Sequence, residues 1–405
     1  MEKFTDGGVC APAGFTAGGM HTGINKDPEK FDVGMIFCEK ICTAAAVYTK
    51  NRVKGATLAV TKRHLENGTA QAVICNSVNA NTCNADGELR AQEMADLASA
   101  ALGISADDVI VASTGVIGKP FDTTPIKEHI NELAADLSKD GSSRCEFAIM
   151  TTDTRKKEIA LEFEAGGRVC RIGGIAKGSG MIHPNMATML CFMTSDCCIS
   201  CDMLQEALSE VTKVTFNRVS VDGDTSTNDM AVILADGMAG NSEITEKNED
   251  YYCFKSALYS VMRSLAREIA RDGEGATKLL ECCCSGAKDE ETAEIAAKAV
   301  ISSSLFKSAM FGADANFGRA MCAIGYSGAD VDINKINLDI ASEKGRITMC
   351  RNGASVPFSE EEAKTVLSED EIKIFIDLGS GDGEAVAWGC DLTYDYVKIN
   401  ADYRS

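Results

Sequence analysis

The stretch Lys177-Gly-Ser-Gly-Met-Ile-His-Pro-Asn-Met-Ala-Thr-Met-Leu190 lies near the middle of the 405-residue chain. Its glycines permit backbone angles that other residues resist, and Pro184 pushes the residue before it toward an extended conformation. The apolar run that follows, residues 189–193, predicts a buried strand. A turn-rich segment therefore delivers Thr188 to the start of a core strand.

A threonine in this position has two interpretations. A hydroxyl is a weak nucleophile until a base takes its proton, and the α-amine of a newly exposed N-terminal threonine can be that base. Because the reference pKa of such an amine is about 7.7, part of it is neutral at physiological pH. The stretch therefore suits a threonine freed by cleavage of its own chain, although a plain glycine-rich loop before a strand has the same composition.

The segments Lys177-Gly-Ser-Gly-Met-Ile and Pro184-Asn-Met-Ala-Thr-Met-Leu resemble the self-cleavage signature of the ornithine acetyltransferase family. These enzymes are the glutamate N-acetyltransferases of the cyclic arginine pathway, and the resemblance covers essentially the whole chain. It implies autocatalytic cleavage between Ala187 and Thr188. Thr188 would then be the nucleophile that carries the acetyl group and contacts the substrate.

Helical patterns and alternating strands run along the chain, with hairpins rather than regular βαβ units, which predicts an α+β fold. The resemblance narrows this to the αββα sandwich of the self-processing aminopeptidase and ornithine acetyltransferase type, with a smaller additional lobe. It divides the chain into an α fragment, residues 1–187, and a β fragment, residues 188–405. We expect the fragments to share one core and neither to have its own, so that they stay associated, as two α and two β fragments in the family's heterotetramer.

Individual elements follow from apolar periodicity. Helices are expected over the ranges 88–102, 124–137, 202–216, 251–271, 291–305 and 359–367. Strands are expected over 57–61, 109–112, 148–154, 159–163, 169–175, 188–194, 230–235 and 277–284. A glycine-rich turn between 372–378 and 384–392 predicts a hairpin, and residues 1–31 read as irregular.

Ser113-Thr-Gly-Val-Ile-Gly follows a predicted strand. A hydroxyl and a backbone N–H at such a position can hold one oxyanion, although a plain turn has the same pattern. The resemblance makes Thr114 and Gly115 the oxyanion-hole pair. It also assigns substrate-binding positions to Thr151, Lys177, Thr188, Glu274, Asn400 and Ser405.

Alternatives to these assignments stay open. Thr152 is an adjacent alternative to Thr151, and from residue type alone Lys177 and Glu274 would be solvated surface charges. The polar ending Asn400-Ala-Asp-Tyr-Arg-Ser405 indicates docking, because free chain ends normally fray. The family usually has glycine where this chain has Val78, which bears on the turn geometry there.

Composition excludes several classes of function. A net charge of −20 argues against a nucleic-acid footprint, which needs a basic patch. There is no apolar signal core and no apolar run long enough to span a bilayer, so we expect a cytoplasmic protein without a membrane partner. The 18 cysteines lack the paired C-x-x-C sets of a zinc site and read as reduced thiols. We expect neither a metal nor a cofactor.

The leading hypothesis is ping-pong transfer of acetyl from N-acetylornithine to glutamate through acetyl-Thr188. A second hypothesis is an N-terminal-nucleophile amidase or aminopeptidase on the same scaffold, in which water resolves the acyl-enzyme. The substrate set at Glu274 and the C-terminus favours transfer. A third is a metabolite-binding module that is never cleaved. The family contains monofunctional and bifunctional members, and the sequence leaves open whether acetyl-CoA is also a donor.

Overall fold

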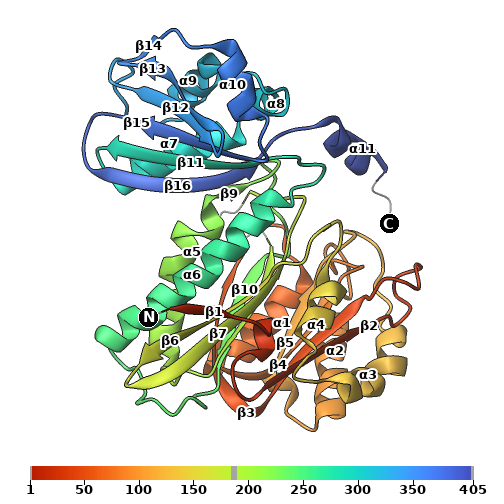
Figure 1. Cartoon of the computed structure of the whole chain (residues 1–405). Coiled ribbons are helices and arrows are strands. Elements are labelled where there is room, and N and C mark those ends of the chain that lie inside the picture. Colours follow the sequence, from red (N-terminus) through yellow and green to blue (C-terminus); the bar gives the residue numbers. More distant parts are fainter. Residues whose placement is uncertain (1, 184–188, 403–405) are drawn as a thin grey trace.

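The structure is a computed structural model that describes residues 2–183 and 189–402. Ala187, Thr188 and Ser405 therefore lie outside the described residues. The chain forms a large lobe and a smaller lobe, and the C-terminal helix α11 (Tyr394–Asp402) extends from the smaller lobe alongside the large one (Figure 1).

The large lobe is built on a sheet whose nine described strands follow the order β1-β6-β7-β8-β10-β3-β4-β5, with β2 paired to β3. These strands are β1 (Lys3–Thr5), β2 (Phe15–Met20), β3 (Val33–Tyr48), β4 (Thr69–Asn76), β5 (Val109–Ser113), β6 (Glu158–Ala165), β7 (Arg168–Lys177), β8 (Leu190–Ser195) and β10 (Met230–Ala235). Its helices are α1 (Ala56–His64), α2 (Gly87–Leu102), α3 (Thr124–Asp136), α4 (Ser142–Ile149), α5 (Cys201–Val214) and α6 (Glu249–Arg271).

Strand β3 folds this sheet into two layers. It has 16 residues, pairs with β10 through its second half, and pairs with β4 across a register shift between Phe37 and Cys42. Because successive side chains of a strand point to opposite faces, Leu190 and Phe192 of β8 pack between the two layers, whereas Cys191 and Met193 pack against α5 and α6. The opposite outer face, on β4 and β5, packs against α2 and α3.

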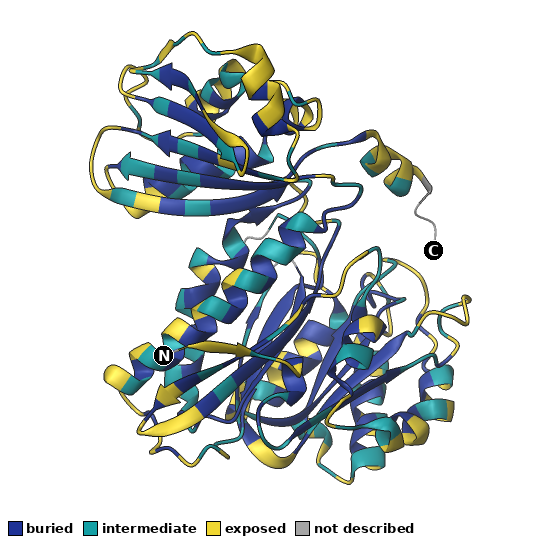
Figure 2. Cartoon of the chain, viewed as in Figure 1, coloured by how far each residue is buried: buried dark blue, intermediate teal, exposed yellow. Residues whose placement is uncertain are grey.

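The order of layers is therefore helix, strand, strand, helix, which confirms the expected αββα sandwich. Buried residues line the strands of both layers and the inner sides of α5 and α6 (Figure 2). The hairpin of β6 and β7 forms at the predicted place, with Leu161 and Phe163 pointing into the core.

The smaller lobe has a second sheet, in the order β14-β13-β12-β15-β11-β16-β9. Its elements are β9 (Val219–Ser220), β11 (Leu279–Ala287), α7 (Glu290–Ser302), α8 (Ser304–Phe311), α9 (Phe317–Tyr326), β12 (Asn337–Ser342), β13 (Gly345–Arg351), β14 (Ala354–Ser355), α10 (Glu360–Leu367), β15 (Glu371–Asp377) and β16 (Gly383–Cys390). Helix α10 begins as predicted, with the Ser359 hydroxyl accepting from the Glu362 N–H at 3.2 Å.

Two expected strands are wrong. Residues 57–61 lie in α1, and their buried positions recur at the three- and four-residue spacing of a helix face. Residues 148–149 end α4 for the same reason, since Cys145, Ala148 and Ile149 form its buried face. An apolar run of five or fewer residues fits the period of a strand as well as that of a helix, so the pattern does not distinguish the two.

Two expectations of pairing and order are also wrong. β15 and β16 do not form a hairpin, because β11 lies between them, parallel to β15 and antiparallel to β16. The segment before residue 32 is not wholly irregular, because it contains β1 and β2. Glycine lowers strand propensity, and the Phe-Thr-Ala-Gly-Gly-Met sequence of β2 hides its pairing with β3.

The core is divided between the lobes in a way that the sequence did not indicate. Strand β8 pairs with β7 on one side and β10 on the other, so residues on both sides of position 188 build the large sheet. A separate cluster, spanning Leu280 to Ala387, is the core of the smaller lobe. We expected neither fragment to have a core of its own. The core of the smaller lobe lies wholly within residues 188–405, so this expectation is wrong for the β fragment.

The tight crossing of β7 over the N-terminal segment gives a stability prediction. A Cβ atom built on Gly173 would lie 1.7 Å from the carbonyl oxygen of Gly8, and backbone cannot move aside as a side chain can. We expect Gly173→Ala to lower the free energy of unfolding by at least the roughly 1–3 kcal/mol of ordinary overpacking.

The matched control is Gly325→Ala in α9, where nothing lies within 4 Å of the added carbon. In that helix we expect alanine to raise stability by up to about 1 kcal/mol. Denaturation monitored by circular dichroism distinguishes the two variants, and equal stability of both would contradict the crossing described here.

Candidate active site

Loops from both layers of the sandwich meet at one place. From one layer come the ends of β4 and β5, and from the other come the end of β7 and the start of β10. The Asn228 amide ties them together by donating to the carbonyl oxygens of Ala80 and Ser113, at 2.5 and 2.9 Å. The sandwich packing therefore brings together segments that are more than 100 residues apart in sequence.

The predicted oxyanion pair lies directly after β5. Gly115 has a φ of +120°, and a Cβ atom there would lie 2.2 Å from the carbonyl oxygen of Val78, so this position requires glycine. Among the described residues the Gly115 N–H has no backbone acceptor, whereas the Thr114 N–H donates to the Asn76 carbonyl at 2.9 Å. Val78 itself is outside the left-handed region, so its backbone does not need the family's usual glycine.

Asn76, which the sequence analysis did not single out, holds this loop. It is fully buried. Its side-chain oxygen accepts from the N–H groups of Val78 and Asn79, at 3.2 and 2.9 Å, and its amide donates to the Ser113 hydroxyl at 2.6 Å. The hydrogen bonds of Asn76 therefore hold residues 78–79 and Ser113, which lie next to Thr114 and Gly115.

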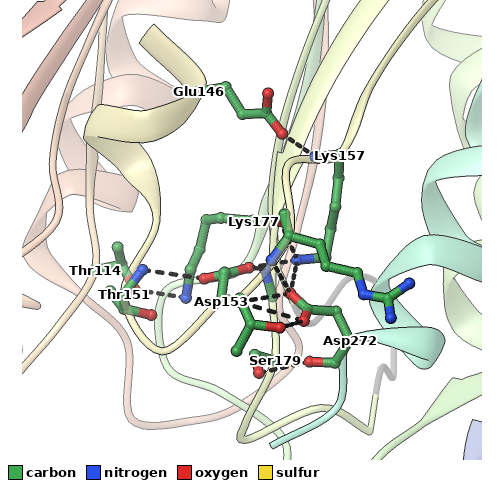
Figure 3. A network of polar contacts seen from close by, with 11 residues as sticks. Thr114, Glu146, Thr151, Asp153, Lys157, Lys177, Ser179 and Asp272 are labelled. Atoms are coloured by element: carbon green, nitrogen blue, oxygen red, sulfur yellow. Dashed lines mark hydrogen bonds and ion pairs between the residues drawn. The ribbon is translucent and has the colours of Figure 1, made fainter. Parts of the chain in front are cut away.

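Lys177, the last residue of β7, is only 8% exposed and is not the solvated surface lysine of the alternative interpretation. Its Nζ lies 3.5 Å from the Thr114 hydroxyl oxygen (Figure 3). Burial alone would raise the pKa of Asp153, but the ammonium groups of Lys177 and Lys157 outweigh it and hold that pKa at about 2. Asp153 is therefore ionised beside Lys177.

Asp153 belongs to a buried polar network that Figure 3 shows. Lys157 Nζ lies 2.7 Å from Asp153 Oδ1 and 2.5 Å from Asp272 Oδ2. The Lys157 backbone N–H in turn donates to the carboxyl group of Glu146. Burial, and secondarily the charge of Glu158, raises the pKa of Glu146 to about 8, so this carboxyl group is largely protonated at neutral pH.

The structure brings two other predicted residues together. The Asn400 amide of α11 donates to Glu274 Oε2 at 2.8 Å, so the C-terminal helix docks at the segment that carries Glu274. Glu274 is 9% exposed rather than solvated, and its backbone N–H donates to the Ser179 carbonyl at 3.0 Å. Ser405, predicted beside them, lies outside the described residues.

A cavity of about 920 Å³ adjoins the loop that carries Thr114 and Gly115. Gly115, Thr151 and Thr152 contribute to its wall, and Ile399 of α11 also lines it. Its volume lies within the range of small-molecule binding pockets. Thr151 and Thr152 both line the cavity, so both stay candidates for substrate contact.

The polar segment 220–229 is a loop beside the candidate site. Asp222 accepts from the N–H groups of Met181 and Ile182. Asp229 precedes β10, whose first N–H, that of Met230, donates to the Met189 carbonyl at 2.9 Å. Burial raises the pKa of Asp229 well above its usual range, and the sequence analysis did not single out this buried acid.

Within residues 2–183 and 189–402, no three His, Cys, Asp or Glu side chains are grouped as metal ligands would be. The 18 cysteines, all of them described, are unpaired thiols. No helix in the described part of the chain is long and apolar enough to cross a bilayer.

Comparison with known proteins gives consistent matches along the chain. A sequence model of the ArgJ family matches residues 16–405. A protein of Symbiobacterium thermophilum, named arginine biosynthesis bifunctional protein ArgJ, is 49% identical over 401 residues, which are 98% of this chain and 99% of that protein. A protein of the same name from Caldanaerobacter subterraneus subsp. tengcongensis is 45% identical over 404 residues, a coverage of 100% for each chain.

A solved structure is also similar. The crystal structure of arginine biosynthesis bifunctional protein argJ from Bacillus halodurans has 49% sequence identity and a TM-score of 0.50. The match covers 97% of that crystallised chain but 52% of this one.

The raised pKa of Glu146 gives a pH-dependent prediction. Its folded-state pKa of about 8 lies above the ordinary value of 4.5, so its stabilising contribution is complete below pH 4.5 and is lost as pH rises through 8. Glu146→Gln keeps an acceptor for the Lys157 N–H but cannot ionise.

We therefore expect the free energy of unfolding of Glu146→Gln to fall less than that of the wild type between pH 5 and about pH 9, because only the wild-type side chain has to ionise in its buried position. Each pKa unit corresponds to about 1.4 kcal/mol. Urea unfolding of both proteins across this range measures the difference. Parallel pH curves would show that Glu146 ionises freely in the folded protein.

Proposed function

The chain belongs to the ArgJ family, and from this premise we propose that it transfers an acetyl group from N-acetylornithine to glutamate through an acetyl-threonine at Thr188. At the coarser level the chain is an acetyltransferase of arginine biosynthesis. The observation that carries the proposal is the family match over residues 16–405, with relatives at 45–49% identity over nearly the whole chain.

We further propose that the chain cleaves itself between Ala187 and Thr188. The Thr188 hydroxyl attacks the Ala187 carbonyl carbon, the peptide bond gives way to an ester, and water opens the ester. This leaves a carboxylate on Ala187 and a free α-amine on Thr188. Pairing of Lys177 with Leu190 across β7 and β8 supports this, because the segment between them leaves and re-enters the sheet at neighbouring positions, so the cut chain stays joined through the sheet.

The coverage of the crystallised relative also supports cleavage. That chain is matched over 97% of its own length yet spans only 52% of this one, so it is about half as long. Residues 188–405 number 218 of 405, which is about the same share. As the resemblance implies, we propose an assembly of two α and two β fragments and a cytoplasmic location.

In the transfer reaction, the free amine of Thr188 takes the proton of its own hydroxyl, and Oγ attacks the acetyl carbonyl of N-acetylornithine. Thr114 and Gly115 stabilise the tetrahedral oxyanion. Ornithine leaves as the protonated amine, and the amine of glutamate then attacks the acetyl-threonine. N-acetylglutamate departs, and the hydroxyl recovers its proton.

The hydrogen bond between Lys177 and Thr114 supports the oxyanion role. The lysine ammonium can only donate, so it occupies a lone pair of the Thr114 oxygen and leaves the Thr114 O–H to point elsewhere. The adjoining Gly115 N–H has no backbone acceptor among the described residues. Together they offer two donors to one developing negative charge.

We propose that the substrate is held at both ends. A carboxylate such as Glu274 pairs with a substrate amine, and an ammonium such as Lys177 pairs with a carboxylate or carbonyl oxygen. Thr151 at the cavity wall, Asn400 beside Glu274, and Ser405 complete the proposed set. The adjacent Thr152 is the alternative to Thr151.

Three assays separate this proposal from its alternatives. Product analysis with and without glutamate distinguishes transfer from an amidase, in which water resolves the acyl-enzyme. Intact mass identifies an uncut metabolite-binding module. Because the relatives are named bifunctional, acetyl-CoA is a candidate second donor, and an assay with acetyl-CoA in place of N-acetylornithine tests it.

The nucleophile assignment predicts that Thr188→Ala gives one uncut chain and no acetyl transfer, because the variant lacks the attacking oxygen. Mass spectrometry and a coupled assay for ornithine release measure both. Thr188→Ser, which keeps a hydroxyl, is the control and should still be cut. Transfer by Thr188→Ala would mean that another nucleophile is responsible.

The oxyanion assignment predicts that Thr114→Ala lowers kcat by about 100- to 1000-fold with little change in KM, because the lost hydrogen bond forms mainly in the transition state. Steady-state kinetics on cleaved protein measure this, with Thr114→Ser as the hydroxyl-retaining control. A KM effect without a kcat effect would instead identify Thr114 as a ground-state substrate contact.

A further inference from the structure

The segments that carry the proposed substrate contacts converge on one buried ammonium group, that of Lys157 (Figure 3). Lys157 lies in the link between α4 and β6, and its side chain is 0% exposed. The carboxylates that it joins, on Asp153 and Asp272, are 0% and 2% exposed and are 119 residues apart in sequence. Lys157 therefore reaches neither solvent nor the cavity, and its role must act through its two partners.

Asp153 connects Lys157 to two of the substrate segments. Its Oδ2 accepts from the Thr151 N–H at 3.0 Å, and its Oδ1 accepts from the Gly178 N–H at 2.7 Å. Gly178 directly follows Lys177. One carboxylate thus fixes both the cavity wall at Thr151 and the backbone on which Lys177 stands.

Asp272 connects Lys157 to the third segment. Its carboxylate accepts from the N–H groups of Thr154 and Arg155. Its backbone carbonyl accepts from the Ser179 hydroxyl at 2.7 Å, and the Ser179 carbonyl accepts from the Glu274 N–H at 3.0 Å. The position of Glu274 is therefore tied to the segment that follows Lys177.

The ammonium group of Lys157 is what joins the two carboxylates. Removing the cation of a buried ion pair leaves its partner uncompensated. Lys177 also acts on Asp153, but among the described residues Lys157 is the cation paired with both Asp153 and Asp272. Without it, nothing would hold the two carboxylates together, and the ties from them to Thr151, Gly178 and Thr154 would no longer be fixed relative to one another. The bond from the Lys157 N–H to Glu146 holds the base of the lysine in place.

We propose that Lys157 is a positioning residue for substrate binding. By joining Asp153 to Asp272, its ammonium group holds the segments 151–153, 177–179 and 272–274 at fixed separation. Thr151, Lys177 and Glu274 then grip the ends of one amino acid. This inference rests on the proposed function, which assigns those three residues to the substrate.

The test is Lys157→Met, which keeps the length and apolar stem of the side chain but removes the charge. We expect KM for both N-acetylornithine and glutamate to rise by about tenfold or more, with kcat per acetylated threonine within about threefold of wild type, because the loss affects substrate binding in the ground state and transition state alike. The number of active sites is counted by the burst of ornithine release. A purely structural role would lower that number and leave KM unchanged.

Lys278→Met is the matched control. Lys278 is also buried, at 9% exposed, but its Nζ donates to the carbonyl oxygens of Met310 and Leu367 in the smaller lobe, at 2.7 and 2.6 Å. This variant should lose stability and active-site count without a change in KM. A KM increase as large as that of Lys157→Met would overturn the proposal.

Removing one partner of a buried ion pair can prevent folding. If Lys157→Met gives no cooperative unfolding transition, Lys157→Met/Asp272→Asn replaces it, because that pair of changes removes opposite charges together. The same KM increase is expected, since the bridge to Asp153 is still lost. Wild-type KM values in either folded variant would overturn the proposal, whereas a wild-type enzyme that transfers no acetyl would overturn the proposed function instead.

Discussion

The antiparallel pairing of β7 with β8 is the constraint on which the site depends. Lys177 ends one strand and its partner Leu190 begins the other, so the segment between them starts and finishes at neighbouring strand ends. β8 is in turn paired with β10, and β10 with β3. A cut in the backbone between 177 and 190 would therefore leave the pairing of β7, β8 and β10 in place.

The long amphipathic helix and several buried strands could be predicted from the sequence, but two short apolar runs were assigned to the wrong kind of element. The helix expected over 251–271 is α6 (Glu249–Arg271), and the strand expected over 230–235 matches β10. In contrast, α1 and the end of α4 were expected to be strands, because a few apolar residues fit either period. Pairing partners were harder still: the insertion of β11 between β15 and β16 is a tertiary choice that no local pattern encodes.

The candidate site residues could be named from the sequence, but the residues that hold them in place could not. Thr114, Lys177 and Glu274 stand in recognisable motifs, and the described structure brings Lys177 to Thr114 and Asn400 to Glu274. The sequence analysis singled out neither Lys157 nor Asp272. Their proposed role depends on a contact between residues 115 positions apart, which only the fold brings together. Residue type also misled, because lysine and glutamate are usually solvated, yet Lys177 and Glu274 are nearly buried.

The docking of α11 has a practical side. Because Asn400 bonds to Glu274, helix α11 is part of the surroundings of the candidate site. An affinity tag or reporter at the C-terminal end would follow this helix within a few residues and could compete with its docking. The start of the chain is better suited for such fusions, since β1 is the edge strand of the large sheet and pairs only with β6 among the described strands.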